Sequence, residues 1–217
     1  MTDVKDSRRG YSSPLRSRQA AATRAAVLAA ARDLFLSQGY GATTVEQVAG
    51  RAGVSKPTVF SAVGNKQTLL SVVRDVAMAG DDEPIAMDER PNARAITDEP
   101  DPARAIDLLV DHIAAVSRRY AGIDDVLRGA AESGEEGPRE LWRTSEDQRL
   151  AGARHWLGAI AAKVPLAAGL DHDTAVDLLW LLMVPDHYRR LVTDRGWPQA
   201  RYRQWLGGQV RALFALT

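Results

Sequence analysis

The sequence predicts an all-α protein in which a three-helix, helix-turn-helix domain precedes a larger helical domain. Three observations carry this prediction. Apolar residues recur at helical spacing along most of the chain, the alternation typical of strands is absent, and residues 43–66 read as a helix, a glycine turn and a second helix. We therefore divide the chain into an arm (residues 1–17), a helix-turn-helix domain (residues 18–65) and a helical domain (residues 66–217).

Composition narrows the class of protein before any motif is considered. Cysteine is absent, which excludes disulfides and thiolate metal sites and suits a reducing cytoplasm. The basic, polar first 19 residues lack the apolar core of a signal peptide, and the longest apolar run is far short of the roughly 20 residues that span a bilayer. We expect a cytoplasmic protein without a membrane segment.

The formal net charge of zero conceals a division along the chain. Residues 1–75 hold 11 Lys and Arg against 5 Asp and Glu, whereas residues 76–217 hold 17 against 23. A basic N-terminal third on an acidic remainder is typical of a nucleic-acid-binding module fused to a domain of another kind, although chance clustering would produce the same division.

The N-terminal region begins with a segment unlike the rest of the chain. Residues 1–17 mix basic side chains with Gly, Ser and Pro, so we expect a disordered arm that either contacts DNA or has no role. Residues 18–38 are rich in alanine and predict one long helix. Gly39 stands where a glycine commonly ends a helix.

The helix-turn-helix follows from local signals. Thr44 can cap a helix over residues 45–52, Gly53 permits a turn, and Ser55 can cap a third helix that Gly64 ends. Pro57 is acceptable in the first helical turn, where its missing N–H would be unpaired anyway. The motif's apolar side chains are expected to form its small core: Val48, Val54, Val59 and Phe60. Ser55, Lys56 and Thr58 are left facing outward, where they can donate hydrogen bonds to phosphates or base edges.

Residues 24–70 resemble the N-terminal domain of the tetracycline-repressor-like (TetR) family of bacterial regulators. The resemblance rests on four short matches along this stretch: Ala29-Ala-Ala-Arg-Asp-Leu-Phe35 followed by Gly39, the pair Thr43-Thr44, the turn Ala52-Gly-Val-Ser55, and Lys66 followed by Leu69-Leu70. The match covers roughly 50 residues, and this combination is more specific than a bare helix-turn-helix.

The resemblance implies roles for individual residues. It implies that Thr58 and Val59 face the DNA bases. It also implies that Thr44, Ser55 and Lys66 bind DNA phosphates. The full set of expected DNA-binding residues is Thr44, Ser55, Lys56, Pro57, Thr58, Val59, Phe60 and Lys66. The family usually has tyrosine where Phe60 stands and often histidine where Ala62 stands, so two phosphate contacts are missing here and the basic arm gains importance.

The remainder of the chain reads as a connector followed by helices. Residues 81–102 mix acidic side chains with prolines, which indicates a connector long enough to be mobile or functional. The helices expected after it cover residues 103–121, 123–133, 138–162, 173–184, 185–194 and 198–216. The resemblance implies that this part binds a small-molecule effector and forms a homodimer.

Two segments support dimerisation independently of the resemblance. Residues 178–184 are apolar on all sides, and the last helix carries an apolar stripe beside Gly207 and Gly208. Either these helices pair with their symmetry mates or they belong to the core of one protomer. The candidates for the effector pocket are the polar-aromatic and sulfur side chains of the middle helices: His112, Tyr120, Trp142, His155, Trp156, Trp180 and Met183.

The four histidines do not form a metal-ligand pattern, and no glycine-rich phosphate loop is present, so we expect no metal and no cofactor. The leading hypothesis is a homodimeric, ligand-responsive repressor on a palindromic DNA operator. One alternative is a ligand-binding or interaction protein with a vestigial DNA-binding domain. The other is an enzyme built on Asp186 and His187, which lacks a nearby nucleophile or oxyanion site.

Overall fold

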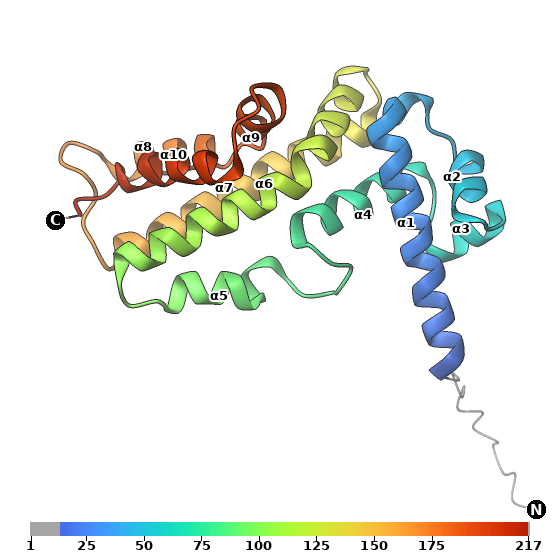
Figure 1. Ribbon diagram of the computed structural model, residues 1–217, viewed down its shortest axis with the longest axis horizontal. Coiled ribbons are helices and arrows are strands. Elements are labelled where there is room, and N and C mark those ends of the chain that lie inside the picture. The colour runs from blue at the N-terminus through green and yellow to red at the C-terminus, as the bar shows by residue number, and fades with distance from the viewer. Residues whose placement is uncertain (1–13, 217) are drawn as a thin grey trace, which may run out of the picture.

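The computed structural model describes residues 14–216, and over these residues the chain is helical, as predicted (Figure 1). The elements are α1 (Pro14–Ala42), α2 (Val45–Ala52), α3 (Lys56–Ala62), α4 (Lys66–Ala79), η1 (Met87–Glu89), α5 (Pro91–Asp98), α6 (Pro102–Glu132), α7 (Glu136–Ala161), α8 (His172–Leu182), α9 (Asp186–Tyr188), η2 (Arg189–Asp194) and α10 (Gln199–Arg211). Within this part of the chain, β structure is limited to one isolated bridge between Leu166 and Phe214. No described helix is both long and apolar enough to span a bilayer.

The first four helices form the N-terminal domain at one end of the molecule (Figure 1). The first helix begins at Pro14, before the predicted start at residue 18, and the rest of the predicted arm lies outside the described residues. Gly39 adopts φ 79°, a left-handed conformation that breaks the helix and directs the buried ring of Tyr40 against Phe35. The predicted termination at Gly39 is therefore confirmed.

The two helices of the predicted motif have the predicted bounds and caps. The hydroxyl of Thr44 accepts a hydrogen bond from the Gln47 N–H, and the Gln47 side chain returns one to the Thr44 N–H, which completes a capping box. Gly53 has φ 68° and closes the C-terminus of α2. Ser55 then caps α3. Local side-chain and glycine signals thus determine this part of the backbone.

The predicted break near residue 122 is wrong, because α6 is one continuous helix. A Cβ atom on Gly122 would lie 2.8 Å from Cδ2 of Leu36, so this glycine permits the close approach of α1 to α6. The sequence near residue 122 predicts the end of one helix and the start of another. In the structure, Gly122 instead allows two helices to cross at close distance.

The segment over residues 81–102 is also more regular than predicted. It contains η1 and α5, and α5 packs on α6 with Ala93 and Ile96 fully buried. The guanidinium of Arg90 makes two hydrogen bonds to the Asp81 carboxylate, of 2.8 and 3.0 Å. Residues 81–90 form the irregular part, which lies between α4 and α5 (Figure 1).

Two hydrophobic cores meet along α6. The first half of this helix packs with α5, α7, α8 and α10, whereas its second half contributes Tyr120, Ile123, Leu127 and Ala130 to the core of the N-terminal domain. Helix α4, which the predicted boundary at residue 65 assigned to the second domain, also packs in the N-terminal core. The two domains are therefore joined by shared helices rather than by a linker.

The two apolar segments that could either form a dimer interface or lie in the core of one protomer differ in their burial. Leu206, Val210, Leu213 and Phe214 of the expected stripe are buried in the protomer's own core. Helix α8 is not buried on every side, since Leu178 and Leu181 are 39% and 48% exposed. These two leucines are three residues apart, so they lie on one face of the helix.

Candidate nucleic-acid interface and effector cavity

The start of α3 presents a polar and aromatic surface. Ser55, Lys56, Pro57 and Phe60 are exposed and Thr58 is half-buried, as residues that contact DNA must be. Phe60 was also predicted to lie in the motif's core, and this is wrong, because its side chain is 46% exposed. Val59 is fully buried, so its predicted role at the bases is contradicted; it anchors α3 to the core instead.

Several of the expected phosphate anchors already have partners inside the domain. The hydroxyl of Ser55 lies 2.7 Å from that of Thr58, and Lys56 is ion-paired with Glu46 of α2. Lys66 donates to the carbonyl of Gly41 at 3.2 Å, and its ammonium lies 4.2 Å from the centroid of the Tyr40 ring. Lys56 remains half exposed, so it can exchange its carboxylate partner for a phosphate.

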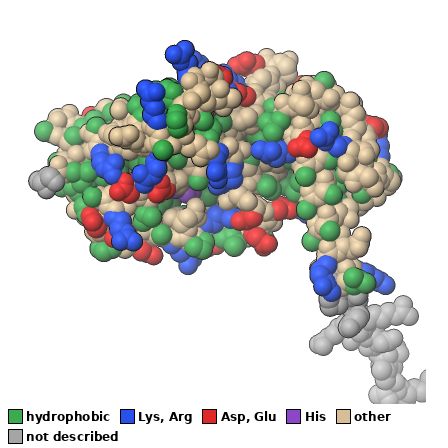
Figure 2. Space-filling view, in the orientation of Figure 1, with side chains coloured by type: hydrophobic (Ala, Val, Ile, Leu, Met, Phe, Trp, Pro, Cys, Tyr) green, Lys and Arg blue, Asp and Glu red, His purple; other side chains and the backbone are tan. Residues whose placement is uncertain are grey.

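The exposed beginning of α1 adds basic groups beside α3. Arg16 lines a shallow groove together with Gln19 of α1 and with Thr58 and Ser61 of α3. Figure 2 shows basic side chains on the part of α1 that projects from the body, whereas both signs of charge are interspersed over the second domain. The sequence indicated a basic N-terminal region, and the fold brings part of it next to α3.

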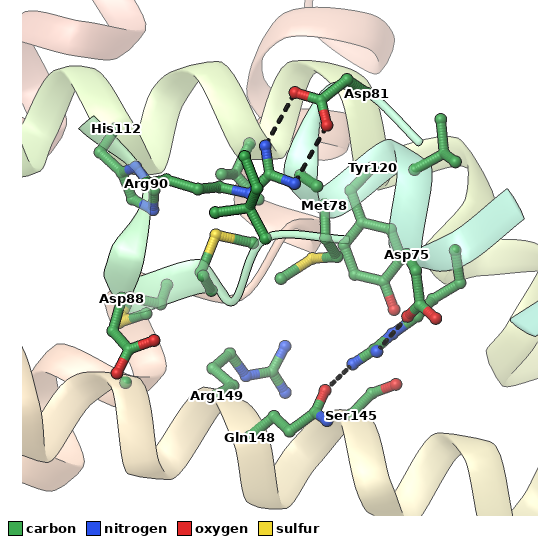
Figure 3. A pocket seen from close by; sticks show the side chains of 18 of the residues that line it. Asp75, Met78, Asp81, Asp88, Arg90, His112, Tyr120, Ser145, Gln148 and Arg149 are labelled. Atoms are coloured by element: carbon green, nitrogen blue, oxygen red, sulfur yellow. Dashed lines mark hydrogen bonds and ion pairs between the residues drawn. The ribbon is translucent and has the colours of Figure 1, made fainter. Parts of the chain in front are cut away.

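A cavity of about 930 Å³ lies between α4, residues 81–90, α6 and α7 (Figure 3). It is lined by five of the seven predicted pocket residues: His112, Tyr120, His155, Trp156 and Met183. The other two lie elsewhere. Trp142 packs on the N-terminal core, and Trp180 packs on the second core with the Arg149 guanidinium 5.5 Å from its ring. Helical spacing alone did not show which face these two tryptophans occupy.

One end of the cavity is polar. Arg74 of α4 is buried and donates to the Asp75 carboxylate at 2.6 Å and to the Gln148 amide oxygen. Tyr120 is 3% exposed, and its hydroxyl points toward the end at which Ser145, Gln148 and Arg149 lie (Figure 3). Burial raises the pKa of the Tyr120 phenol well above its ordinary value, so the group stays protonated.

The opposite end of the cavity presents an uncharged aromatic surface formed by His112 and Trp156. His112 packs against Trp156, with ring centroids 5.6 Å apart, and its Nδ1 lies 3.1 Å from the Asn92 amide nitrogen. Burial, and secondarily the charge of Arg119, lower the pKa of His112 to about 4. The imidazole is therefore neutral at physiological pH and presents a flat, uncharged wall.

Arg24 connects α3 with a residue that lines this cavity. Its Nη1 donates to the carbonyl of Ala62 in α3 at 2.9 Å, and its Nη2 donates to the carboxylate of Asp82 at 3.0 Å. Both Arg24 and Asp82 line the cavity. No local feature of the sequence marks Arg24, because its partners Ala62 and Asp82 are distant in the chain and meet it only in the fold.

Asp186 and His187 do not form a catalytic dyad. The Asp186 carboxylate is paired with Arg189 and Arg190, and Nε2 of His187 lies 3.0 Å from the Leu181 carbonyl. Within residues 14–216, no group of three or more His, Cys, Asp and Glu side chains could hold a metal ion.

The helix-turn-helix and the helical domain that shares its core together define a regulator of transcription. Residues 27–73 match the family model described as "Bacterial regulatory proteins, tetR family". The chain is 29% identical over 175 residues to the HTH-type transcriptional regulator YdeS of Bacillus subtilis (strain 168), which is described as uncharacterized; the match covers 79% of each chain. The resemblance seen in the sequence is confirmed: residues 27–73 are similar to bacterial regulatory proteins of the tetR family, and most of the chain is similar to an HTH-type transcriptional regulator.

Solved structures share the fold over nearly the whole chain. NalD, the secondary repressor of the MexAB-OprM multidrug efflux pump in Pseudomonas aeruginosa, matches with a TM-score of 0.65 at 22% identity and covers 91% of this chain and 98% of its own. MexZ, described as a key repressor responsible for antibiotic resistance in the same organism, matches with a TM-score of 0.59 at 22% identity. The match covers 87% of this chain and 92% of the MexZ chain. At this identity the likeness establishes the fold.

Proposed function

We propose that the protein is a homodimeric repressor that releases a palindromic DNA operator when a small molecule enters the cavity. The observation that carries this proposal is the double role of α4. Leu69, Leu70 and Val73 of α4 lie in the core of the DNA-binding domain, whereas Arg74 and Met78 of the same helix line the cavity. A ligand that displaces α4 therefore moves the domain that carries α3.

Dimerisation is supported by the exposed leucines of α8. Removing apolar surface from water stabilises a protein by about 25 cal/mol per Å² of surface buried. Leu178 and Leu181 face outward beside α10, so a partner that covers them would gain this free energy. A two-fold pairing of these helices would cover both leucines and would provide two copies of α3, as an operator with half-sites roughly 34–36 Å apart requires. NalD and MexZ, which share the fold, are repressors, and this supports repression over activation.

The operator proposal is tested by fluorescence anisotropy with DNA from the promoter region of the protein's own gene, at several salt concentrations. Sequence-selective binding that weakens with salt is expected, because phosphate contacts release counterions. Lys56→Ala combined with Thr58→Ala should lower affinity at least tenfold, whereas Arg94→Ala, an exposed arginine on α5, should not. Unchanged regulation in cells by the double variant would favour a vestigial DNA-binding domain.

The dimer is tested separately by sedimentation of Leu181→Glu. A buried, unpaired carboxylate at a two-fold interface should convert the dimer to a monomer and lower operator affinity. Ala95→Glu adds the same charge on the exposed side of α5, on the opposite side of the bundle from α8 (Figure 1), and should leave the dimer intact. A dimer that persists in Leu181→Glu contradicts the proposed interface.

A further inference from the structure

Four residues that line the cavity each have a buried side-chain donor without a hydrogen-bond partner. These donors are Nε of Arg74, Nε of Arg90, Nε of Arg149 and the hydroxyl of Tyr120. A buried donor without a partner costs about 1–3 kcal/mol. An acceptor from outside the chain would give these groups a partner.

Three of the four donors lie together. Arg74 is hydrogen-bonded to Gln148, and the Tyr120 hydroxyl points to the same end of the cavity as Gln148 and Arg149 (Figure 3). Although Ser145, Arg74 and Asp124 are close enough to affect the phenol's pKa, none makes a hydrogen bond of good geometry with it. Arg90 lies nearer the other end, where Asp81 already binds it through two nitrogens.

The charge of Arg74 is incompletely balanced inside the protein. Its partner Asp75 is 56% exposed, so water weakens the attraction, and its other partner, Gln148, is neutral. Arg149 is paired with Glu146, whose side chain does not line the cavity. A buried guanidinium is stable when it is both paired and hydrogen-bonded, and an oxyanion in the cavity would supply both for Arg74.

The remaining wall suits an apolar body. Met78, Val116, Trp156 and Met183 line the space beyond the donors, and the neutral His112 adds a flat surface. Methionine side chains adapt to ligands of different shape. The acidic residues among 81–88 also line the cavity, and Arg24 and Arg90 pair with two of them, Asp82 and Asp81.

We propose that the effector is a carboxylate with an apolar body, whose carboxylate oxygens accept hydrogen bonds from Arg74, Tyr120 and Arg149. This assignment rests on the proposed role of the cavity as the effector site. It deepens that role by giving the chemical class of the ligand. The carboxylate would bind between α4, α6 and α7, and would thereby fix the position of α4 relative to the second domain.

The test compares three probes with the same decyl chain: decanoate, 1-decanol and decylammonium. Binding to the full-length protein is measured by calorimetry and by intrinsic tryptophan fluorescence, to which Trp156 at the cavity contributes. Decanoate is expected to bind at least tenfold more tightly than the other two, because hydrogen bonds to charged groups are stronger. No decanoate binding, or equal or tighter binding of the alcohol or the amine, overturns the proposal.

Variants locate the binding site. Tyr120→Phe should weaken decanoate binding about tenfold and leave decanol binding nearly unchanged. Tyr202→Phe is a matched control, because the Tyr202 hydroxyl is equally buried and unpartnered but does not line the cavity. Arg74→Met and Arg149→Met provide a second test, each with its thermal unfolding measured. Equal effects of Tyr120→Phe and Tyr202→Phe would overturn the proposal.

Operator release distinguishes the two proposals. If decanoate binds as expected but leaves operator affinity unchanged, the ligand class stands and the cavity is not the effector site. If operator binding responds to decylammonium alone, the effector role stands and the proposed ligand class is wrong.

Discussion

Arg24 contacts both α3 and Asp82 at the cavity, and we predict that Arg24 and Asp82 are energetically coupled. The Arg24→Gln substitution removes the ion pair with Asp82 and the hydrogen bond to the Ala62 carbonyl. The ion pair is about one-third exposed on both sides, which limits its contribution to about 0.5–1 kcal/mol. The bond to Ala62 adds about 1 kcal/mol. Arg24→Gln should therefore lower the free energy of unfolding by about 1.5–2 kcal/mol.

A double-mutant cycle with Asp82→Asn separates these contributions. Asp82→Asn alone should cost about 0.5–1 kcal/mol, and almost nothing more once Arg24 has been replaced, so the coupling energy should be about 0.5–1 kcal/mol. Urea unfolding of the wild type, both single variants and the double variant measures it, with Asp33→Asn, which removes another surface pair to Arg51, as a control that should be additive. Additive effects of Arg24→Gln and Asp82→Asn, within about 0.3 kcal/mol, would refute the linkage.

Three further predictions concern the interface, the turn and a buried carboxyl. Phe60→Tyr should raise operator affinity several-fold by adding a donor on the exposed face of α3, with unfolding unchanged; unchanged affinity would show that this face does not meet DNA. Gly53→Ala should cost about 1 kcal/mol because φ is +68° there, whereas Gly50→Ala in the same helix should be neutral or stabilising; equal effects in urea unfolding would contradict this. Burial raises the pKa of Asp124 to about 6, so its ionisation destabilises the fold as pH rises from about 4 to above 6. Asp124→Asn should therefore gain about 3 kcal/mol at pH 8 and little at pH 4, and a gain independent of pH would exclude this cause.

The helix-turn-helix could be predicted closely because its signals are local. Thr44, Ser55 and Asn65 cap helices through their own side chains, and Gly39 and Gly53 adopt left-handed backbone conformations. These effects act within a few residues, so the sequence contains them fully. The DNA-facing set was predicted less well, because helical spacing did not separate the buried Val59 from the exposed Phe60.

The errors in the second domain have a common physical cause. Gly122 has a role only because α1 passes close to it, and Arg74 lines the cavity only because α7 brings Gln148 beside it. Such contacts join residues far apart in the chain, so no local sequence signal predicts them. Tyr120 and His112 could be proposed as cavity residues from their type, but Trp142 shows that type does not determine which side of a helix faces a cavity.

The sharing of α6 between both cores has a consequence for folding. Tyr120, Ile123 and Leu127 complete the core that α1 and α4 begin, so a fragment ending after Ala79 would expose the apolar surface that these side chains cover. The first half of α6 is equally embedded in the second core. Loss of either core therefore exposes one half of the same helix, and the chain should denature in a single cooperative transition rather than domain by domain.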